Sequence, residues 1–374
     1  MGLNMNIFAG TGSITPYAVI NVNGQTIASG FNGRLISVNV EDKSGVTSDT
    51  VSIELRDGEP FIEIPKKGDI IEVWLGYKET GVANFGKFTI DDPDISMFPF
   101  QISISGKGAD MRDGLKSQKS RHWDNKTIKD IMTDIANDNN LEPRIDDEIG
   151  AHQYKWLGQQ DESDIHFGER LAKKHGAIFS VKDGKLIFAK KGNDKSTTGK
   201  ELTVVIASPA NITNSSAKVK FSYRSKFKNV KAHVQDKNTA KREDVSEESD
   251  VEGTADYEIA EPFATKDEAQ AAAKAKAKEL KSKTATTSVT LVGDPTIRSG
   301  APFKYVNCRP EVDDLEFNIE TATHEISKSG YTVSIEANLN ADKDNETKKK
   351  QKSKKKTTSE TKTHDLDWSD IEKK

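Results

Sequence analysis

Paired carboxylates are the residues of this chain whose type and spacing could support acid and base catalysis. Asp91 and Asp92 stand close to Asp94, and Asp313 is followed directly by Asp314. Two carboxylates flanking a bond are what glycoside hydrolysis uses. Each group here lies beside a turn signal, where aspartate is usually solvated. We therefore assign no catalytic residue and predict that the chain is not an enzyme.

Metal and cofactor chemistry has no support in the spacing of the remaining reactive residues. The seven histidines include no His-Glu-x-x-His pattern and no cysteine partner, so no metal site is assigned. His166 and His175 are expected to be surface or C-terminal residues of a helix. The segment SGKGAD at 105–110 holds one G-x-G without the rest of a dinucleotide- or phosphate-binding pattern, and no cofactor is assigned. The single cysteine, Cys308, follows a strand-like segment and is expected to be buried.

The C-terminal stretch HDLDWSDI sets three apolar residues among acidic ones: Leu366, Trp368 and Ile371. This pattern is typical of a short docking motif for a partner, and plain disorder remains the alternative. The surrounding tail, residues 341–374, carries 11 lysines and eight carboxylates, so residues 1–340 hold a net charge of −7 out of the total of −4. The tail is predicted to be disordered, and the acidic body argues against specific nucleic-acid binding.

The bulk composition favours a multidomain protein outside the membrane. A chain of 374 residues exceeds the size at which one core usually stops growing. Hydrophobic residues make up 34%, and no apolar run approaches the roughly 18 residues that a membrane span needs. The N-terminus shows no basic region followed by an apolar one, so synthesis and folding in a cytoplasm are expected.

The first half of the chain divides into a β part and an α+β part. Residues 1–112 alternate apolar and polar side chains between Gly and Pro turns, as in TVSIELRD, and predict a β-barrel domain. Residues 113–206 predict an α+β middle domain with two helices and a hairpin. Thr127 begins the first helix with a capping box, and Ser163 is the expected N-cap of the second.

The second half repeats the β pattern. VEDK pairs with VQDK, TVSIELRDGEP with TTSVTLVGDP, and three further strand segments follow in the same order. Chance similarity of alternating strands is the alternative explanation. The repeat predicts a second barrel from residues 207–237 and 284–340, interrupted by an acidic segment and an Ala-rich helix at 238–283. The predicted fold class is mainly β with α+β insertions, in which two similar tube-like barrels flank and carry small α+β domains.

A family resemblance follows from this organisation and from three segments. These are ESDIHFGERLAKKHG at 162–176, DPTIRSGAPFKYV at 294–306 and FNIETATHEISKSGYTVSIEA at 317–337. Together they resemble the late control D family of phage tail hub proteins, which is similar to the N-terminal half of type VI secretion spike proteins. The resemblance covers roughly residues 15–340.

The resemblance implies a structural hub in the baseplate of a contractile phage tail or tail-like bacteriocin. A homotrimer with two barrels per chain presents six similar units, which adapts a sixfold tail tube protein to a threefold spike. The implied partners are the tube, a separate trimeric spike and baseplate wedge proteins, with neither a membrane nor a specific nucleic acid among them. DNA or tape-measure protein would pass through the lumen. Assembly is expected in the bacterial host cytoplasm and the final location in the virion.

The alternative function is a secreted or tail-associated β protein that binds carbohydrate or peptidoglycan, or that degrades cell walls. Such a protein needs exposed aromatic platforms or an essential Asp or Glu. Trp74, Trp123, Trp156 and Trp368 are widely dispersed along the chain. Binding or turnover of cell-wall substrate would distinguish this alternative from a scaffold.

Overall fold

Strands dominate the computed structural model of the protein, and the predicted class of a mainly β protein with α+β insertions is confirmed. No helix in the described part of the chain is long and apolar enough to span a bilayer. The structure describes residues 14–26, 33–108, 113–182, 184–191, 202–213, 216–235, 242–249 and 253–343.

The first β unit contributes eight strands to one large sheet. Alternation drives them into place: in β4, Val51, Ile53 and Leu55 are buried while their neighbours face out. The strands are β1 (Pro16–Val22), β2 (Gln25–Thr26), β3 (Leu35–Lys43), β4 (Thr50–Arg56), β5 (Ile70–Tyr77), β6 (Gly81–Ile90), β7 (Asp94–Met97) and β8 (Phe100–Gly108).

The second β unit repeats the strand order of the first. In the first unit, neighbouring strands run β3-β4-β8-β6-β5, and in the second they run β15-β19-β22-β21-β20. This is the order that a duplicated unit predicts. The second unit's strands are β14 (Val205–Ala207), β15 (Lys218–Phe221), β19 (Ala285–Val292), β20 (Pro302–Tyr305), β21 (Glu316–Ser327) and β22 (Gly330–Leu339), and a short helix, α7 (Pro310–Asp313), follows β20.

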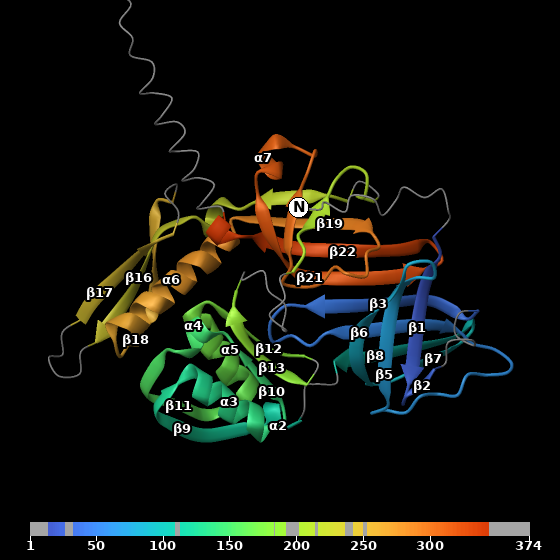
Figure 1. Cartoon of the computed structure of the whole chain (residues 1–374), viewed down its shortest axis with the longest axis horizontal. Coiled ribbons are helices and arrows are strands. Elements are labelled where there is room, and N and C mark those ends of the chain that lie inside the picture. The colour runs from blue at the N-terminus through green and yellow to red at the C-terminus, as the bar shows by residue number, and fades with distance from the viewer. Residues whose placement is uncertain are drawn as a thin grey trace, which may run out of the picture.

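The two β units are not closed barrels, so that part of the prediction is wrong. Strand β3 pairs with β21 of the other unit, with Ser37 to Lys43 opposite Ser327 to Thr321 in antiparallel register. The backbone groups at these strand edges, which could have closed each barrel, thus form hydrogen bonds between the two units. The result is a single 14-stranded sheet that runs from β15 to β2 with open ends, and Figure 1 shows β19, β22, β21 and β3 side by side.

Residues 227–235 do not belong to the second β unit, contrary to the prediction from VQDK. Strand β16 (Phe227–Gln235) pairs with β17 (Arg242–Glu248) and β18 (Ala255–Phe263) in a separate sheet. Helix α6 (Lys266–Ser282) covers this sheet, which we call the helix-backed sheet. The apolar face of β16 packs against the alanines of α6, and together they form a separate hydrophobic core. Strand β15 takes the place in the large sheet that the prediction gave to β16. The 3-10 turn η1 (Tyr223–Ser225) separates β15 from β16.

The middle unit folds around a third core and contains both predicted helices. Thr127 caps α3 with the full capping box, and Ser163 caps α5, which ends at left-handed Gly176. Its elements are α2 (Asp113–Lys116), β9 (Gln118–Thr127), α3 (Ile128–Asp138), β10 (Glu142–Ile145), α4 (Asp147–Gly150), β11 (Gln153–Ser163), α5 (Asp164–His175), β12 (Ala177–Lys182) and β13 (Lys185–Lys190).

Cys308 is exposed, so the expected burial is wrong. Strand β20 already ends at Tyr305, and Asn307 adopts a positive φ of 58°. The chain therefore turns before the alternation of the strand reaches Cys308, and the thiol lies in a surface turn ahead of α7.

A close approach at Gly293 joins the two β units and generates a prediction. Tyr77 of the first unit donates its hydroxyl to the Gly293 carbonyl at 2.8 Å, and a Cβ at Gly293 would meet the ring of Tyr331 at 2.2 Å. We expect Gly293→Ala to lower the free energy of unfolding by about 1–3 kcal/mol through overpacking. Gly108→Ala is the matched strand control, since its Cβ would meet nothing closer than 3.7 Å. Equal thermal stability of the two variants would contradict the assignment.

Candidate functional site: an interunit joint and two open sheet edges

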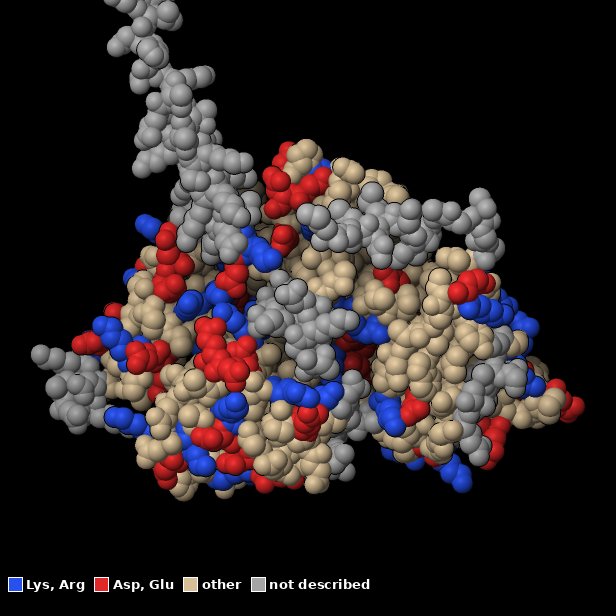
Figure 2. All heavy atoms as spheres, viewed as in Figure 1, with Lys and Arg blue, Asp and Glu red and all other residues tan. Residues whose placement is uncertain are grey.

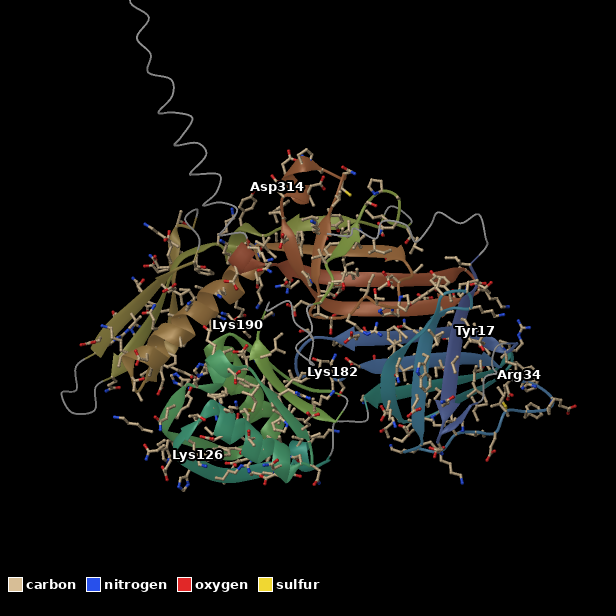
Figure 3. The ribbon with its side chains drawn as sticks, viewed as in Figure 1. Tyr17, Arg34, Lys126, Lys182, Lys190 and Asp314 are labelled. Atoms are coloured by element: carbon tan, nitrogen blue, oxygen red, sulfur yellow. The ribbon has the colours of Figure 1, made fainter. Side chains whose placement is uncertain are left out.

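A half-buried lysine joins the middle unit to the first β unit. The Lys182 ammonium, at the end of β12, donates to the Asp42 carboxylate at 2.6 Å and to the Lys43 carbonyl at 2.7 Å. Its nitrogen also lies 3.0 Å from Oδ1 of Asp49, in the loop between β3 and β4. Figure 3 shows Lys182 where the middle unit meets the large sheet. One cation thus serves two carboxylates.

The same carboxylate reaches the second β unit. Ser299 donates its backbone N–H to Asp42 Oδ2 at 3.0 Å and its hydroxyl to Oδ1 at 2.7 Å. Asp42 is 8% exposed, and these donors with Lys182 satisfy both of its oxygens. A single side chain on β3 of the first unit therefore binds both the middle unit and the second β unit. Asp42, Asp49, Lys182 and Ser299 together form the interunit joint.

Burial and charge act against each other on the ionisable groups of the joint. Burial opposes ionisation of Asp42, but Lys182 and Ser299 outweigh it and hold the pKa of Asp42 below its usual value. Burial also disfavours the charged Lys182, yet the two carboxylates raise its pKa. Asp49 receives less compensation: burial first, and repulsion from Asp42, raise its pKa to about 6.

The joint opens into a recess of about 550 Å³ lined by all three units. On one wall, Arg298 stacks on Phe85, with the guanidinium carbon 3.9 Å from the ring centroid, and donates to the Asn84 carbonyl at 3.1 Å. The side chains that line the recess carry charges of both signs. Lys191 and Glu320, for example, form an ion pair at 2.8 Å. On the face shown in Figure 2, Lys and Arg are interspersed with Asp and Glu over the middle unit.

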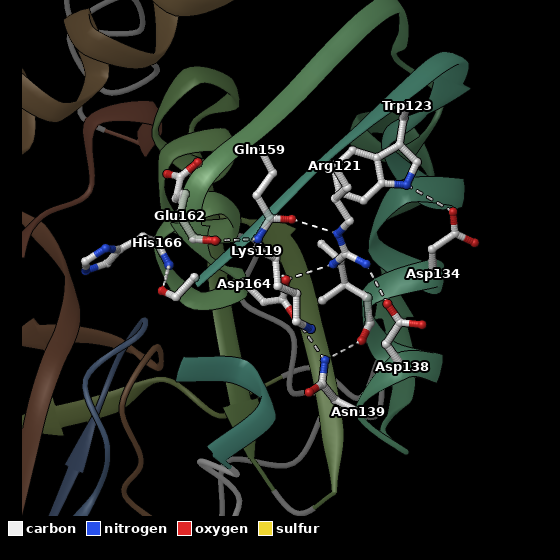
Figure 4. A network of polar contacts seen from close by, with 12 residues as sticks. Lys119, Arg121, Trp123, Asp134, Asp138, Asn139, Gln159, Glu162, Asp164 and His166 are labelled. Carbon is white, nitrogen blue, oxygen red and sulfur yellow. Dashed lines mark hydrogen bonds and ion pairs between the residues drawn. The ribbon is translucent and has the colours of Figure 1, made fainter. Parts of the chain in front are cut away.

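A second polar network occupies ESDIHFGERLAKKHG, residues 162–176, which is the motif most specific to the resemblance. Asp164, at the start of α5, is fully buried and accepts hydrogen bonds from four side chains (Figure 4). Burial opposes its ionisation, but the donors lower its pKa. The donors are Lys119 at 2.6 Å, Arg121 at 2.8 Å, Gln159 at 2.9 Å and Asn139 at 3.1 Å.

The other residues of this motif are also structural. Glu162 binds the Arg170 guanidinium through both oxygens, with the shortest contact 2.8 Å. Phe167 and Leu171 are fully buried in the core of the middle unit. Because Glu162, Asp164 and Arg170 are engaged by the protein itself, their role is to attach α5 to the β9 and β11 hairpin.

Exposed apolar side chains gather at two strand edges of the large sheet, which are the β7 end, where β7 branches off β8, and the β15 end, where the sheet begins. At the β7 end, Met97 is 66% and Phe98 is 88% exposed, and the rings of Phe61 and Phe100 are in contact with centroids 5.7 Å apart. At the β15 end, Phe221 is 52% and Tyr223 is 77% exposed. Exposed apolar groups at strand edges mark surfaces suited to protein contacts.

The candidate catalytic carboxylates each have a different partner in the fold. Asp91 lies 3.1 Å from Lys107 and Asp92 lies 3.4 Å from Lys67, in exposed pairs. Asp313 instead accepts from the backbone N–H of Cys308 at the start of the turn before α7.

The other predicted residues divide between the middle unit and the tail. His175 ends α5 with its ring 2.7 Å from the Tyr154 hydroxyl, and burial lowers its pKa to about 3. Within the described ranges, no group of three or more His, Cys, Asp or Glu is arranged to hold a metal. The docking motif of Leu366, Trp368 and Ile371 lies outside the described residues.

The joint residues were missed by the sequence analysis, although one signal was present. Val38 and Val40 face the core, and alternation places Asp42 at the next inward position of β3. A carboxylate at an inward strand position requires a buried partner. The partner, Lys182, lies 140 positions away, and no local pattern identifies it.

Removal of the joint cation tests its role. We expect Lys182→Met to destabilise the protein by about 3–5 kcal/mol, because two buried carboxylates lose their counterion. Lys190→Met is the matched control: it ends the neighbouring strand β13 and makes only a 3.3 Å contact with an exposed glutamate. Denaturant unfolding of both variants measures the difference, and similar losses would show that the joint cation has no special role.

The raised pKa of Asp49 predicts a pH dependence. Folding raises this pKa from 3.8 to about 6, so the folded state holds a proton that the unfolded chain releases between these values. The contribution of Asp49 to stability is therefore full below about pH 4 and is lost as the pH rises through 6. Asn at this position does not titrate, so the free energy of unfolding of Asp49→Asn should rise relative to that of the wild type between pH 4 and 7, by on the order of 2 kcal/mol in denaturant unfolding. A difference that stays constant with pH contradicts this.

Comparisons with known proteins place these features in a family. The model of the phage tail baseplate hub (GPD) family matches residues 84–330. The probable baseplate hub protein of Escherichia phage 186 is 30% identical over 369 residues, covering 89% of this chain and 95% of its own.

Two solved structures share the fold. The 43 kDa tail protein of prophage MuSo2 from Shewanella oneidensis superposes with a TM-score of 0.68 at 16% identity, over 88% of this chain and 99% of its own. A type VI secretion component from E. coli gives a TM-score of 0.51 at 10% identity, over 81% of this chain and 73% of its own. The predicted similarity to type VI proteins is thus confirmed for the fold. Since the family model spans most of the chain and a full-length relative agrees with it, the chain belongs to the phage tail baseplate hub (GPD) family.

Proposed function

We propose that the protein is the structural hub of a contractile tail and works as a homotrimer that adapts a sixfold tube to a threefold spike. The repeated strand order of the two β units carries this proposal. Two similar units per chain, taken three times, make a ring of six near-equivalent surfaces. A sixfold tube can then meet a threefold particle through nearly the same contacts at every position.

The two exposed strand edges of the large sheet, at β7 and β15, support a head-to-tail arrangement of the copies. The β7 end and the β15 end belong to different units and expose different apolar side chains, among them Phe98 and Phe221. A contact between unlike surfaces repeats from copy to copy and closes into a ring when the rotation permits it. Burial of both ends in that contact would cover the exposed apolar groups.

The remaining partners follow from the same role. The tube protein would bind one face of the ring, and a separate trimeric spike would bind the other. Wedge proteins of the baseplate would contact the middle unit and the helix-backed sheet, which lie outside the large sheet (Figure 1). The motif of Leu366, Trp368 and Ile371 is a further docking element for the spike. DNA would pass through the ring without specific binding, and the role requires no catalysis.

The location follows from the relatives, which are probable baseplate hub proteins of phages. Assembly would take place in the bacterial host cytoplasm, and the finished protein would lie in the baseplate of the virion or tail-like particle.

Native mass spectrometry tests the oligomeric state. We expect three chains per particle, both for the full chain and for a variant truncated after residue 340, because the tail takes no part in the ring. A monomer that persists at high concentration in the presence of the spike would refute the proposal. Loss of the trimer on truncation would assign the tail a role in assembly.

A further inference from the structure

A cluster of two histidines and a tyrosine lies at the C-terminal end of α5. His175 is the last residue of α5, His152 directly precedes β11, and Tyr154 lies on β11. The Nε2 atom of His175 is 2.7 Å from the Tyr154 hydroxyl oxygen. The ring centroids of His152 and His175 are 4.7 Å apart, and those of His152 and Tyr154 are 4.9 Å apart. The three rings are therefore in mutual contact.

Helix α6 approaches α5 next to this cluster, and Figure 1 shows the two helices side by side. A Cβ at Gly176, the residue after His175, would lie 3.3 Å from the Cβ of Ala275 on α6. The Lys174 ammonium lies 5.7 Å from the centroid of the Phe263 ring on β18. The cluster thus adjoins the contact between the middle unit and the helix-backed sheet.

The surroundings of the two imidazoles fit their neutral form. The Nε2 atom of His152 is buried and has no hydrogen-bond partner among the described residues, so a proton on it would be a buried donor without an acceptor. Neutral His175 and neutral Tyr154 can share one hydrogen bond. Protonation of both histidines would place two cations in adjacent rings, and these cations repel each other.

Burial dominates over the charged groups around the cluster. Burial first, and then the neighbouring histidine and the Lys174 ammonium, lower the pKa of His175 to about 3. Burial also raises the pKa of Tyr154, as does the carboxylate of Glu268 in the first turn of α6, whereas Arg170 lowers it. The C-terminal end of a helix favours a cation, and at the end of α5 burial outweighs that preference.

We propose that His152 and His175 form an acid-sensitive latch, which holds α5 against α6 while both imidazoles are neutral and releases the helix-backed sheet when they are protonated. Release brings the rings into water, where their charge is hydrated. The latch acts within one chain, and it goes beyond the proposed hub function without depending on the ring of copies.

The direction of the pH effect follows from proton linkage. The closed contact holds the pKa of His175 at about 3, and opening returns it to the ordinary value of 6.5, so the open state binds the proton more tightly. The contact is therefore fully stable above about pH 6.5 and weakens as the pH falls from 6.5 toward 3. The equilibrium constant for opening should increase about 25-fold between pH 7 and pH 5.

Thiol accessibility tests the latch in the full chain. In a Cys308→Ser background, which removes the single native cysteine, Ala275→Cys reports opening of the contact between α5 and α6. We expect its labelling rate, normalised to that of the unfolded chain at each pH, to rise about 25-fold from pH 7 to pH 5. Ala273→Cys is the matched control and should stay far slower at both pH values, because Ala273 packs in the core between α6 and β16. Equal rates for the two cysteines at pH 5 would show unfolding instead of release and would overturn the latch.

Two histidine substitutions identify the group that titrates. His175→Gln keeps a hydrogen-bonding group for Tyr154 and should remove most of the rise in labelling. His166→Gln changes an exposed histidine of the same helix and should leave the rise unchanged. A rise that persists in His175→Gln would rule out this histidine as the acid-sensitive group.

Exchange of the imidazole Cε1 hydrogens, followed by mass spectrometry, needs no substitution and measures the pKa of each histidine in the native chain. We expect no titration of His175 between pH 5 and pH 8. Titration of His175 near pH 6.5 would overturn the latch, and the proposed hub function would stand, because its test is the number of chains per particle.

Discussion

Pairing between β3 and β21 is the constraint on which the architecture depends. A strand at the edge of a sheet exposes N–H and C=O groups that must find partners. Here the edge of the first β unit finds them on the second, so the two units share one sheet instead of closing separately. Other interunit contacts lie across the same boundary, including the bonds from Tyr77 to Gly293 and from Ser299 to Asp42.

The middle unit is attached at this boundary through charged side chains. Partial burial of the Lys182 ammonium costs hydration free energy, and the carboxylates of Asp42 and Asp49 compensate for that cost. An ion pair of this kind adds little net stability, but its contacts form in only one relative orientation of the two units. The joint therefore fixes the position of the middle unit relative to the sheet, which a rigid scaffold requires.

The residues most specific to the family have a role consistent with a scaffold. Asp164 is saturated by donors, and Glu162 is held by Arg170, so neither is available to a substrate. Their effect is to make α5 and the β9 and β11 hairpin one body. In the proposed role the functional groups are surfaces, and the edges at β7 and β15 are among the described surfaces that carry exposed apolar side chains.

Local sequence patterns determined the elements and their order. Alternation located β4, the caps at Thr127 and Ser163 located two helices, and the repeated punctuation predicted two units with the same strand order. These features depend on residues a few positions apart. The candidate site was not predicted, although the inward position of Asp42 was a local hint of a buried charge.

Tertiary structure alone decided which edges pair and which charges meet. Residues 218–221 and 227–235 both read as strands, yet only the first enters the large sheet, because the apolar face of the second is covered by α6. Closure of the barrels was lost to the pairing of β3 with β21, and Lys182 met Asp42 across a long stretch of chain. The partners of strand edges and buried charges are residues that tertiary packing brings close. Because these partners are far apart in the sequence, no local pattern identifies them.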